Sequence, residues 1–300
     1  MAGYYPMIML RAGARLPPFS LEQPTAKELY PATFSRVAHA YKRRLDEVMA
    51  RGEAHGRAAV IDWVDPVPGN RILDLACGPG TLSYPLARAV SPGGEVVGID
   101  LAPGMLELAQ RDAPPGLPLT FVLMDMEDLR FPDRRFDAAA SGHGLQFVPE
   151  LKRALSETRR VLKPGARMAA SVPVDPARAS DAQTILERVV SGTLPPVPKA
   201  RDQFATRRIV EDEESFATIA KEAGFSEAEV VRYEESTSWA SPRHFVEMSG
   251  SWWSMALRLE RISPSERASL LERAQRAIEE ALGLGRLQIA GATNVLRAIA

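Results

Sequence analysis

Apolar and polar positions follow two different periods along the chain, and these periods predict helices and strands in turn. Apolar residues recur three and four apart between Thr33 and Arg51, which predicts an amphipathic helix with Pro31 as its start signal. Short apolar runs then alternate with helical segments, which predicts βαβ units and a mostly parallel sheet. The predicted strands cover residues 71–75, 95–100, 119–124, 136–140 and 167–172, and the predicted helices cover 55–64, 81–90, 103–113 and 151–161.

The pattern changes after Val172. Residues 173–212 are rich in Pro, Ala and Arg and carry little strand signal, which predicts an insertion over the sheet edge. Beyond it we expect helices over 214–224, 242–261 and 264–282, a strand through Val230, Val231 and Tyr233, and a closing strand from Leu287 that runs into a short terminal turn or helix by Ile299. The expected organisation is an N-terminal arm (1–30), lid helices (31–65), a cofactor-binding core (66–173), a lid insertion (174–212), and the rest of the core with a helical substrate cap (213–300).

The first predicted strand ends in a turn that contains Gly78 and Gly80. Glycines at this place let backbone N–H groups and a helix N-terminus approach a ligand. Asp100 lies twenty positions beyond Gly80, at the end of the next strand, where a carboxylate can accept hydrogen bonds from ribose hydroxyls. A dinucleotide fingerprint would have a third glycine where this chain has Ser83. The pattern therefore predicts a nucleotide cofactor.

Composition narrows the class of protein. The chain has 300 residues, 25% of them charged, and a formal net charge of −1, so we expect no nucleic-acid partner. No segment reaches the roughly 20 apolar residues of a membrane span. The apolar N-terminus has Pro6 and no preceding basic residue, and Cys77 is the only cysteine, so we expect a cytoplasmic protein. The sequence has no Cys/His cluster, and we expect no metal.

Four stretches together match a known family in order and spacing: LDLACGPG at 73–80, GIDLAPGML at 98–106, DMEDLRFPDRRFD at 125–137 and RVLKPG at 160–165. With them, the chain resembles the class I S-adenosylmethionine (SAM) dependent methyltransferases, and among these the small-molecule enzymes similar to ubiquinone/menaquinone C-methyltransferases. FSRVAHAY at 34–41 is similar to the N-terminal helix of that subfamily. Lys42 and the segment 145–147 depart from it, where the quinone enzymes usually carry Asp and an Arg-Asn pair.

The resemblance implies an α/β fold with a Rossmann-like, seven-stranded, mostly parallel sheet, helical lid insertions, and SAM as the cofactor. It places Gly78 and Gly80 at the methionine part of SAM, Asp100 on the ribose hydroxyls, and Asp125 on the adenine amino group. Alternatives remain for these residues: glycines that serve turn geometry alone, an Asp100 that caps a helix, and an Asp125 in a solvated turn. The full set of expected cofactor-binding residues is Asp74, Ala76, Cys77, Gly78, Gly80, Asp100, Leu101, Met105, Asp125, Met126, Glu127 and Ser141.

Two residues are candidates for catalysis. His143 follows the fourth strand, where ligands bind in open α/β sheets, and its near-neutral titration suits a general base; a positioning or packing role is the alternative. Tyr41 closes over the methionine end of SAM or packs in the core. Four aromatic residues of the late segments either roof an aromatic substrate or bury the insertion: Trp239, Phe245, Trp252 and Trp253.

The sequence thus predicts a SAM-dependent methyltransferase that acts on carbon, nitrogen or oxygen of a small aromatic or otherwise apolar metabolite. One alternative is an NAD(P)-dependent oxidoreductase, which uses the same strand, glycine and acid arrangement. Another is a methyltransferase fold that uses SAM without methyl transfer. The charged late helix and the N-terminal arm are candidate surfaces for a homodimer.

Overall fold

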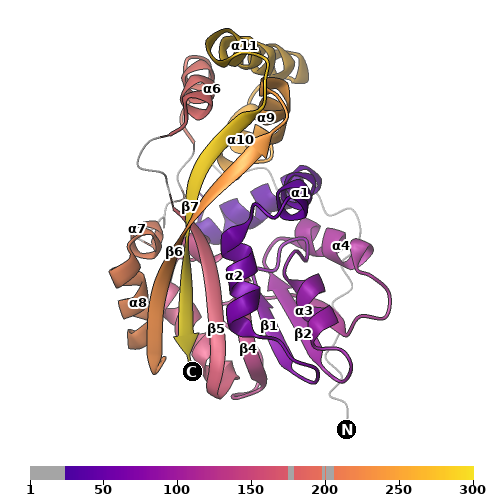
Figure 1. Ribbon diagram of the computed structural model, residues 1–300, viewed down its shortest axis with the longest axis vertical. Helices are drawn as coiled ribbons and strands as arrows, with labels where there is room; N and C mark the ends of the chain where they lie inside the picture. The colour runs from indigo at the N-terminus through magenta and orange to yellow at the C-terminus, as the bar shows by residue number, and fades with distance from the viewer. Residues whose placement is uncertain (1–23, 175–178, 198–199, 201–205) are drawn as a thin grey trace.

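The computed structural model describes residues 24–174, 179–197, 200 and 206–300 (Figure 1). Its described strands form one seven-stranded sheet in the order β3-β2-β1-β4-β5-β7-β6. β1 to β5 are parallel to one another, and β7 pairs antiparallel with both β5 and β6. This confirms the expected α/β fold. The strands are β1 (Arg71–Leu75), β2 (Glu95–Asp100), β3 (Leu119–Leu123), β4 (Phe136–Gly142), β5 (Leu162–Val174), β6 (Glu227–Trp239) and β7 (Leu287–Ile299).

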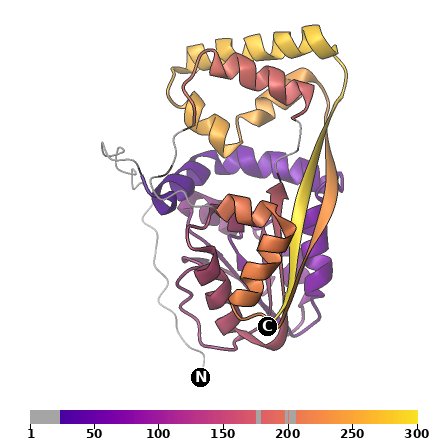
Figure 2. The same ribbon diagram turned by 90° about the vertical axis from the view of Figure 1, so that its left-hand side faces the viewer.

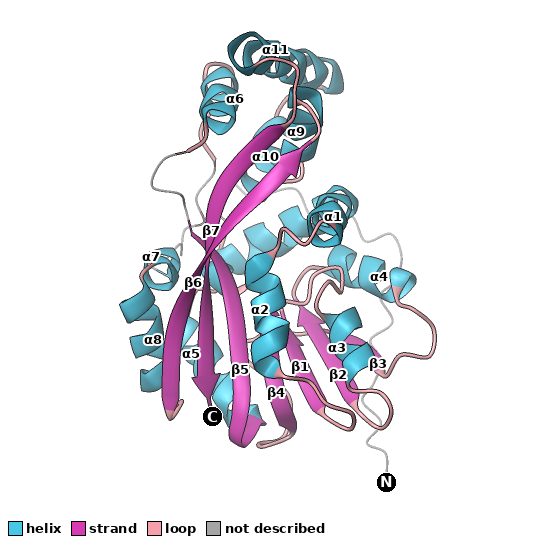
Figure 3. Cartoon of the chain, viewed as in Figure 1, coloured by secondary structure: helices cyan, strands magenta, loops and turns pink. Residues whose placement is uncertain are grey.

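Helices cover both faces of the sheet, because the central strands are apolar on both sides. In β1, Leu73 and Leu75 pack with the α5 and α8 side, whereas Ile72 packs with α2 and α3 on the opposite side. Because β1, β2 and β4 are parallel, their carboxyl ends meet at one edge of the sheet, below α1 (Figure 3). The helices of this part are α1 (Ala26–Ala50), α2 (His55–Val64), α3 (Ser83–Ala89), α4 (Pro103–Asp112), α5 (Leu151–Val161), α7 (Thr206–Glu211) and α8 (Glu213–Glu222).

The first helix begins earlier than the periodicity predicts. α1 starts at Ala26 behind a capping box of Thr25 and Glu28, and Pro31 lies inside it. A proline within a helix removes a backbone hydrogen bond and crowds the preceding turn, and here the capping box and the burial of Leu29, Tyr30 and Thr33 accompany a helix that continues through it. The expected arm over 1–30 is therefore helical from Ala26, and its first 23 residues lie outside the described part of the chain.

The last two strands continue past the sheet and carry an upper layer of helices. β5 pairs with β7 only as far as the Val174 and Ala292 pair, whereas β6 and β7 remain paired out to Trp239 and Leu287. This two-stranded ribbon rises above the sheet edge, and the upper helices pack together at its end, over α1 (Figures 1 and 2). These helices are α6 (Asp181–Ser191), α9 (Pro242–Ser249), α10 (Trp253–Leu259) and α11 (Pro264–Leu282).

The upper layer has its own apolar core and corrects three predictions. Its core joins α6, α9, α10 and α11 around Phe245, Leu270 and Ile278. The insertion helix α6 thus packs against α11 in this layer and not over the sheet edge. The helix expected over 242–261 is two helices, separated at 250–252, and β7 runs to Ile299 without a terminal turn or helix because it is paired on both sides there.

No helix within the described residues is long and apolar enough to cross a membrane.

Candidate active site

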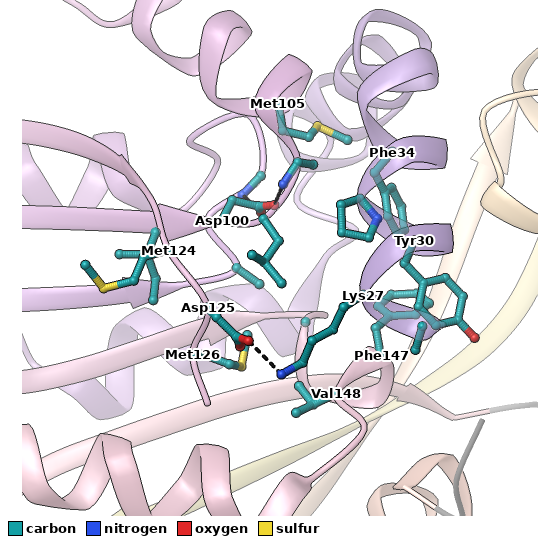
Figure 4. Close-up of a pocket in the computed structure, with 18 of the residues that line it drawn as sticks. Lys27, Tyr30, Phe34, Asp100, Met105, Met124, Asp125, Met126, Phe147 and Val148 are labelled. Carbon is teal, nitrogen blue, oxygen red and sulfur yellow. Dashed lines mark hydrogen bonds and ion pairs between the residues drawn. The ribbon is translucent and has the colours of Figure 1, made fainter. Parts of the chain in front are cut away.

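A cavity of about 120 Å³ lies at the carboxyl ends of β1, β2 and β4. Ala76, Gly78 and Asp100 line it, and α1, with Tyr30 and Phe34, lies across from Asp100 (Figure 4). Sequence expectations and the structure agree on much of the lining. Ten of the expected site residues line this first cavity: Tyr41, Ala76, Gly78, Asp100, Leu101, Met105, Asp125, Met126, Glu127 and His143.

Asp100 is held by the backbone around it. Its carboxylate accepts hydrogen bonds from the N–H of Gly78 at 2.9 Å and from the N–H of Ala102 at 2.8 Å. Burial raises its pKa, while these two N–H groups lower it. The N-cap of α4 is Ala102, so Asp100 stands outside the helix and braces the glycine turn. Asp100 lines the cavity, and a carboxylate has room for further hydrogen bonds besides these two.

Lys27, which the sequence analysis does not include among the site residues, lies near the start of α1 and contacts the segment that follows β3. Its Nζ contacts Asp125 Oδ2 at 2.6 Å and Glu127 Oε2 at 2.5 Å (Figure 4). Burial opposes its charge, but the two carboxylates outweigh burial and raise the pKa of Lys27. The signal for it was present: the capping box Thr25-x-x-Glu28 starts α1 early enough to include Lys27.

A second, smaller cavity next to the first one is lined by Asp74, Cys77 and Arg57. Asp74 is fully buried and accepts a hydrogen bond from Ser83 Oγ, while its Oδ1 has no partner among the described residues. Burial, and to a smaller degree Asp100, raises the pKa of Asp74 to about 7. Arg57, at 6% exposure, donates from Nη2 to Tyr41 Oη at 3.3 Å. A carboxylate and a guanidinium thus face one small space.

The remaining predicted cofactor residues support the turn from behind. The hydroxyl of Ser141 donates to Leu75 O at 3.0 Å, and a side chain at position 80 would clash with Tyr84. Neither Ser141 nor Gly80 lines the first or the second cavity. Burial raises the pKa of the Cys77 thiol well above its usual value, so this thiol stays protonated.

A third cavity, of about 650 Å³, opens between α1, the ribbon and the upper helices, and we call it the chamber. Phe34, Tyr41, His143 and Phe147 line both the chamber and the first cavity, so the two spaces meet at these side chains. Trp239, Trp252 and Trp253 line the chamber, whereas Phe245 is fully buried in the upper core. Phe245 therefore packs in the core of the upper layer, whereas the role of the three tryptophans toward a substrate stays a prediction.

His143 lies at the junction in an unusual backbone conformation, with φ of +62°. Its N–H donates to Ser171 O at 2.9 Å, and its carbonyl accepts from Gln146 Nε2 at 2.8 Å. Burial first, and then the charges of Arg57 and Arg44, lower the pKa of His143 well below its usual value. The ring is neutral at physiological pH, so it is able to accept a proton but is a weak base.

The segment that contains the glycine turn is similar to known proteins. Residues 72–165 match the family model described as a methyltransferase domain. A 2-phytyl-1,4-naphtoquinone methyltransferase of Trichormus variabilis is 38% identical over 46% of this chain and 62% of its own length. A demethylmenaquinone methyltransferase of Symbiobacterium thermophilum is 36% identical over 50% of this chain and 62% of its own length. The chain thus spans less than two thirds of these curated relatives.

Among solved structures, the [4+2]-cyclase SpnF has the same fold, with a TM-score of 0.54 and 19% identity over 93% of this chain and 98% of its own. This chain therefore has the fold of that structure, and its segment 72–165, which contains the glycine turn beside the first cavity, is similar to methyltransferase domains. In this chain the domain model covers residues 72–165, and the sequence similarity is to quinone methyltransferases.

Proposed function

We propose that this protein transfers a methyl group from SAM to a small aromatic or apolar metabolite. The observation that carries the proposal is the meeting of two cavities at His143 and Tyr41: a small one at the glycine turn and a large aromatic one beside it. Bound SAM would supply an already activated methyl group, so the main task of the protein is to align the two reactants and to exclude water. The proposed lid consists of α1 and the upper helices.

The residues at the glycine turn fit this cofactor. Asp100 would accept from the ribose hydroxyls, and Asp125 would accept from the adenine amino group, with Leu101 and Met105 against the ring. The unpartnered Oδ1 of Asp74 suits the ammonium of the methionine part, and Arg57 suits its carboxylate. Gly78 leaves open space where a side chain would otherwise project.

The relatives suggest a quinone-type acceptor, since they are named as naphthoquinone and menaquinone methyltransferases. An aromatic acceptor agrees with the lining of the chamber, in which Phe34, Phe147 and the tryptophans supply apolar surface. Most chamber residues lie outside the matched segment 72–165, so the acceptor of this chain need not be that of its relatives. We also propose a cytoplasmic protein that binds no nucleic acid, supported by the net charge of −1 and the single cysteine. A homodimer remains a prediction.

Cofactor selectivity tests the proposal. We expect the purified protein to bind SAM and S-adenosylhomocysteine (SAH) in calorimetry and to bind neither NAD(H) nor NADP(H). With SAM labelled at the methyl group, label should pass to a reduced naphthoquinone or a related aromatic acceptor, with a mass gain of one methylene. Binding of nicotinamide cofactors alone would contradict the proposal. Binding of SAM with a transformed substrate that carries no label would indicate a fold that uses SAM without methyl transfer.

Replacement of His143 separates chemistry from binding. We expect His143→Ala to lower kcat by about 10²-fold, the usual contribution of general acid–base catalysis, and to leave the affinity for SAM nearly unchanged. The physical reason is that His143 lies at the junction of the cavities and not at the ribose or adenine end. Single-turnover rates measured beside SAM affinity check this expectation. Undiminished turnover would leave His143 with a positioning role only.

Replacement of Lys27 tests whether α1 is a lid. We expect Lys27→Met to speed the dissociation of SAH by about 5-fold, which corresponds to roughly 1 kcal/mol, because it removes both contacts that tie α1 to Asp125 and Glu127. Stopped-flow displacement gives this rate. Lys152→Met is the control, since it breaks an exposed ion pair with Glu222 away from the cavities. Slower dissociation in Lys27→Met would show that Lys27 competes with the cofactor for Asp125.

A further inference from the structure

The chamber presents buried polar atoms that have no partner among the described residues. Those atoms are Arg44 Nε, His143 Nε2, Gln146 Oε1 and Trp239 Nε1, and all of these residues line the chamber. Nearly all buried polar groups in proteins are hydrogen-bonded. Several unpartnered polar atoms around one aromatic space, among them the donors Arg44 Nε and Trp239 Nε1, therefore point to a ligand that is apolar over most of its surface and carries a polar group.

The charges around the chamber indicate the sign of that polar group. Arg44 forms no ion pair with any described residue. The carboxylate of Glu235 accepts from the N–H of Gly56 at 2.8 Å, and Arg207 pairs with Glu211 at 2.8 Å. Arg44, Arg57 and Arg207 thus outnumber Glu235 on the chamber wall, and Arg44 has no carboxylate partner among the described residues.

Arg44 and Arg57 face different spaces. Arg57 lines the small cavity beside Asp74 as well as the chamber, whereas Arg44 lines the chamber and neither cavity at the glycine turn. The guanidinium of Arg44 lies over the ring of Tyr41, with 5.3 Å between its Cζ and the ring centroid. Burial and the nearby Arg57 lower the pKa of Arg44 to about 10, which leaves it protonated at neutral pH. The side chain of Arg44 is partly exposed but its Nε is buried, and a cation with buried atoms is costly unless an anion pairs with it.

We propose that the acceptor binds in the chamber as an anion, an aromatic or apolar molecule with an ionised acidic oxygen that pairs with Arg44. The aromatic walls then hold the body of the acceptor, and Arg44 fixes the end that carries the charge. Carboxylate and phenolate oxygens share this chemistry, and a guanidinium recognises either. This inference rests on the proposed function, because it takes the chamber as the acceptor site.

The test uses two probes of one shape. 1-Naphthoate carries an ionised oxygen, and 1-naphthamide is its neutral counterpart. Calorimetry on the full chain, with and without SAH, should give about 10- to 100-fold tighter binding of the naphthoate, as expected for a hydrogen-bonded charge pair. In Arg44→Gln this preference should fall to less than about 3-fold, within the range of a neutral hydrogen bond. Arg44→Lys keeps the charge and should keep part of the preference, which guards against a variant that fails to fold.

Arg43→Gln is the matched control, since Arg43 is the exposed neighbour on the same helix, and it should keep the full preference. Equal binding of the two probes by the natural protein, binding of neither, or a preference that survives in Arg44→Gln would overturn the inference. A loss of SAH affinity in both Arg44 variants would assign Arg44 to the cofactor and overturn it as well. Failure of the natural protein to bind SAH would refute the proposed function instead, because the probe preference is also measured without SAH.

Discussion

Asp100→Ala is expected to weaken the binding of SAM and of SAH by about 10- to 100-fold. The charged hydrogen bonds that this carboxylate would make to the ribose are worth roughly 1 to 3 kcal/mol, and a tenfold change corresponds to 1.4 kcal/mol. The variant also removes the hydrogen bonds that the N–H groups of Gly78 and Ala102 donate to Asp100, at 2.9 and 2.8 Å. Calorimetric titration with SAH measures the effect without dependence on the acceptor.

The control for this prediction is Asp128→Ala. Asp128 is an exposed carboxylate in the same half of the sheet and pairs with Arg130 at 3.6 Å. Asp128→Ala should leave the affinity for SAH unchanged, because Asp128 lines none of the described cavities. If the Asp100 variant is folded and binds SAH as the natural protein does, Asp100 is a brace for the glycine turn and not the ribose site.

Asp74→Asn is expected to raise the free energy of unfolding of the cofactor-free protein at pH 8 by about 4 kcal/mol. Burial raises the pKa of Asp74 to about 7, against an ordinary value of 3.8. The folded state therefore binds one more proton than the unfolded state between those values. The protonated Asp74 carboxyl contributes fully to the free energy of unfolding below about pH 4, and this contribution is lost as the pH rises through about 7. The loss amounts to about 1.36 kcal/mol for each unit by which the two pKa values differ.

Urea unfolding at pH 4.5, 6 and 8 checks this expectation. The difference in stability between Asp74→Asn and the natural protein should grow with pH, whereas Asp128→Asn, on the surface, should give a small and constant difference. An Asp74→Asn variant that is equally destabilised at all three values would show that the carboxylate is ionised and well solvated. SAM should reverse the order at pH 8, because Asp74 in its ionised form is the proposed partner of the cofactor ammonium.

Much of the sheet around the glycine turn could be predicted from local sequence. The strand that ends at Leu75, the turn at Gly78 and the position of Asp100 follow from apolar runs, glycine spacing and the end of the next strand. These features depend on residues within a few positions of one another or on a repeated βαβ unit. For the same reason β1, β2, α2, α5 and α11 have the predicted bounds.

The start of α1 and the break between α9 and α10 were predicted wrongly because competing local signals were weighed incorrectly. Pro31 is a common helix start, but the capping box of Thr25 and Glu28 marks an earlier one. In the late region Gly250 is the C-cap of α9, and the chain turns at 250–252 before α10 begins, so a local glycine signal outweighs the apolar periodicity there.

The sequence by itself predicted the class of fold and a nucleotide site at one edge of the sheet, because these follow from short-range patterns, and the resemblance of four motifs predicted SAM as the cofactor. Only the tertiary structure decided that Lys27 lies on Asp125, that Arg57 lies beside Asp74, and that the ribbon encloses a chamber with Arg44 in its wall. A single Lys or Arg on a helix has no local signature, since its environment is made by elements far away in the chain. The chamber exists because β6 and β7 remain paired beyond the end of β5, and register over that distance is a property of the folded sheet.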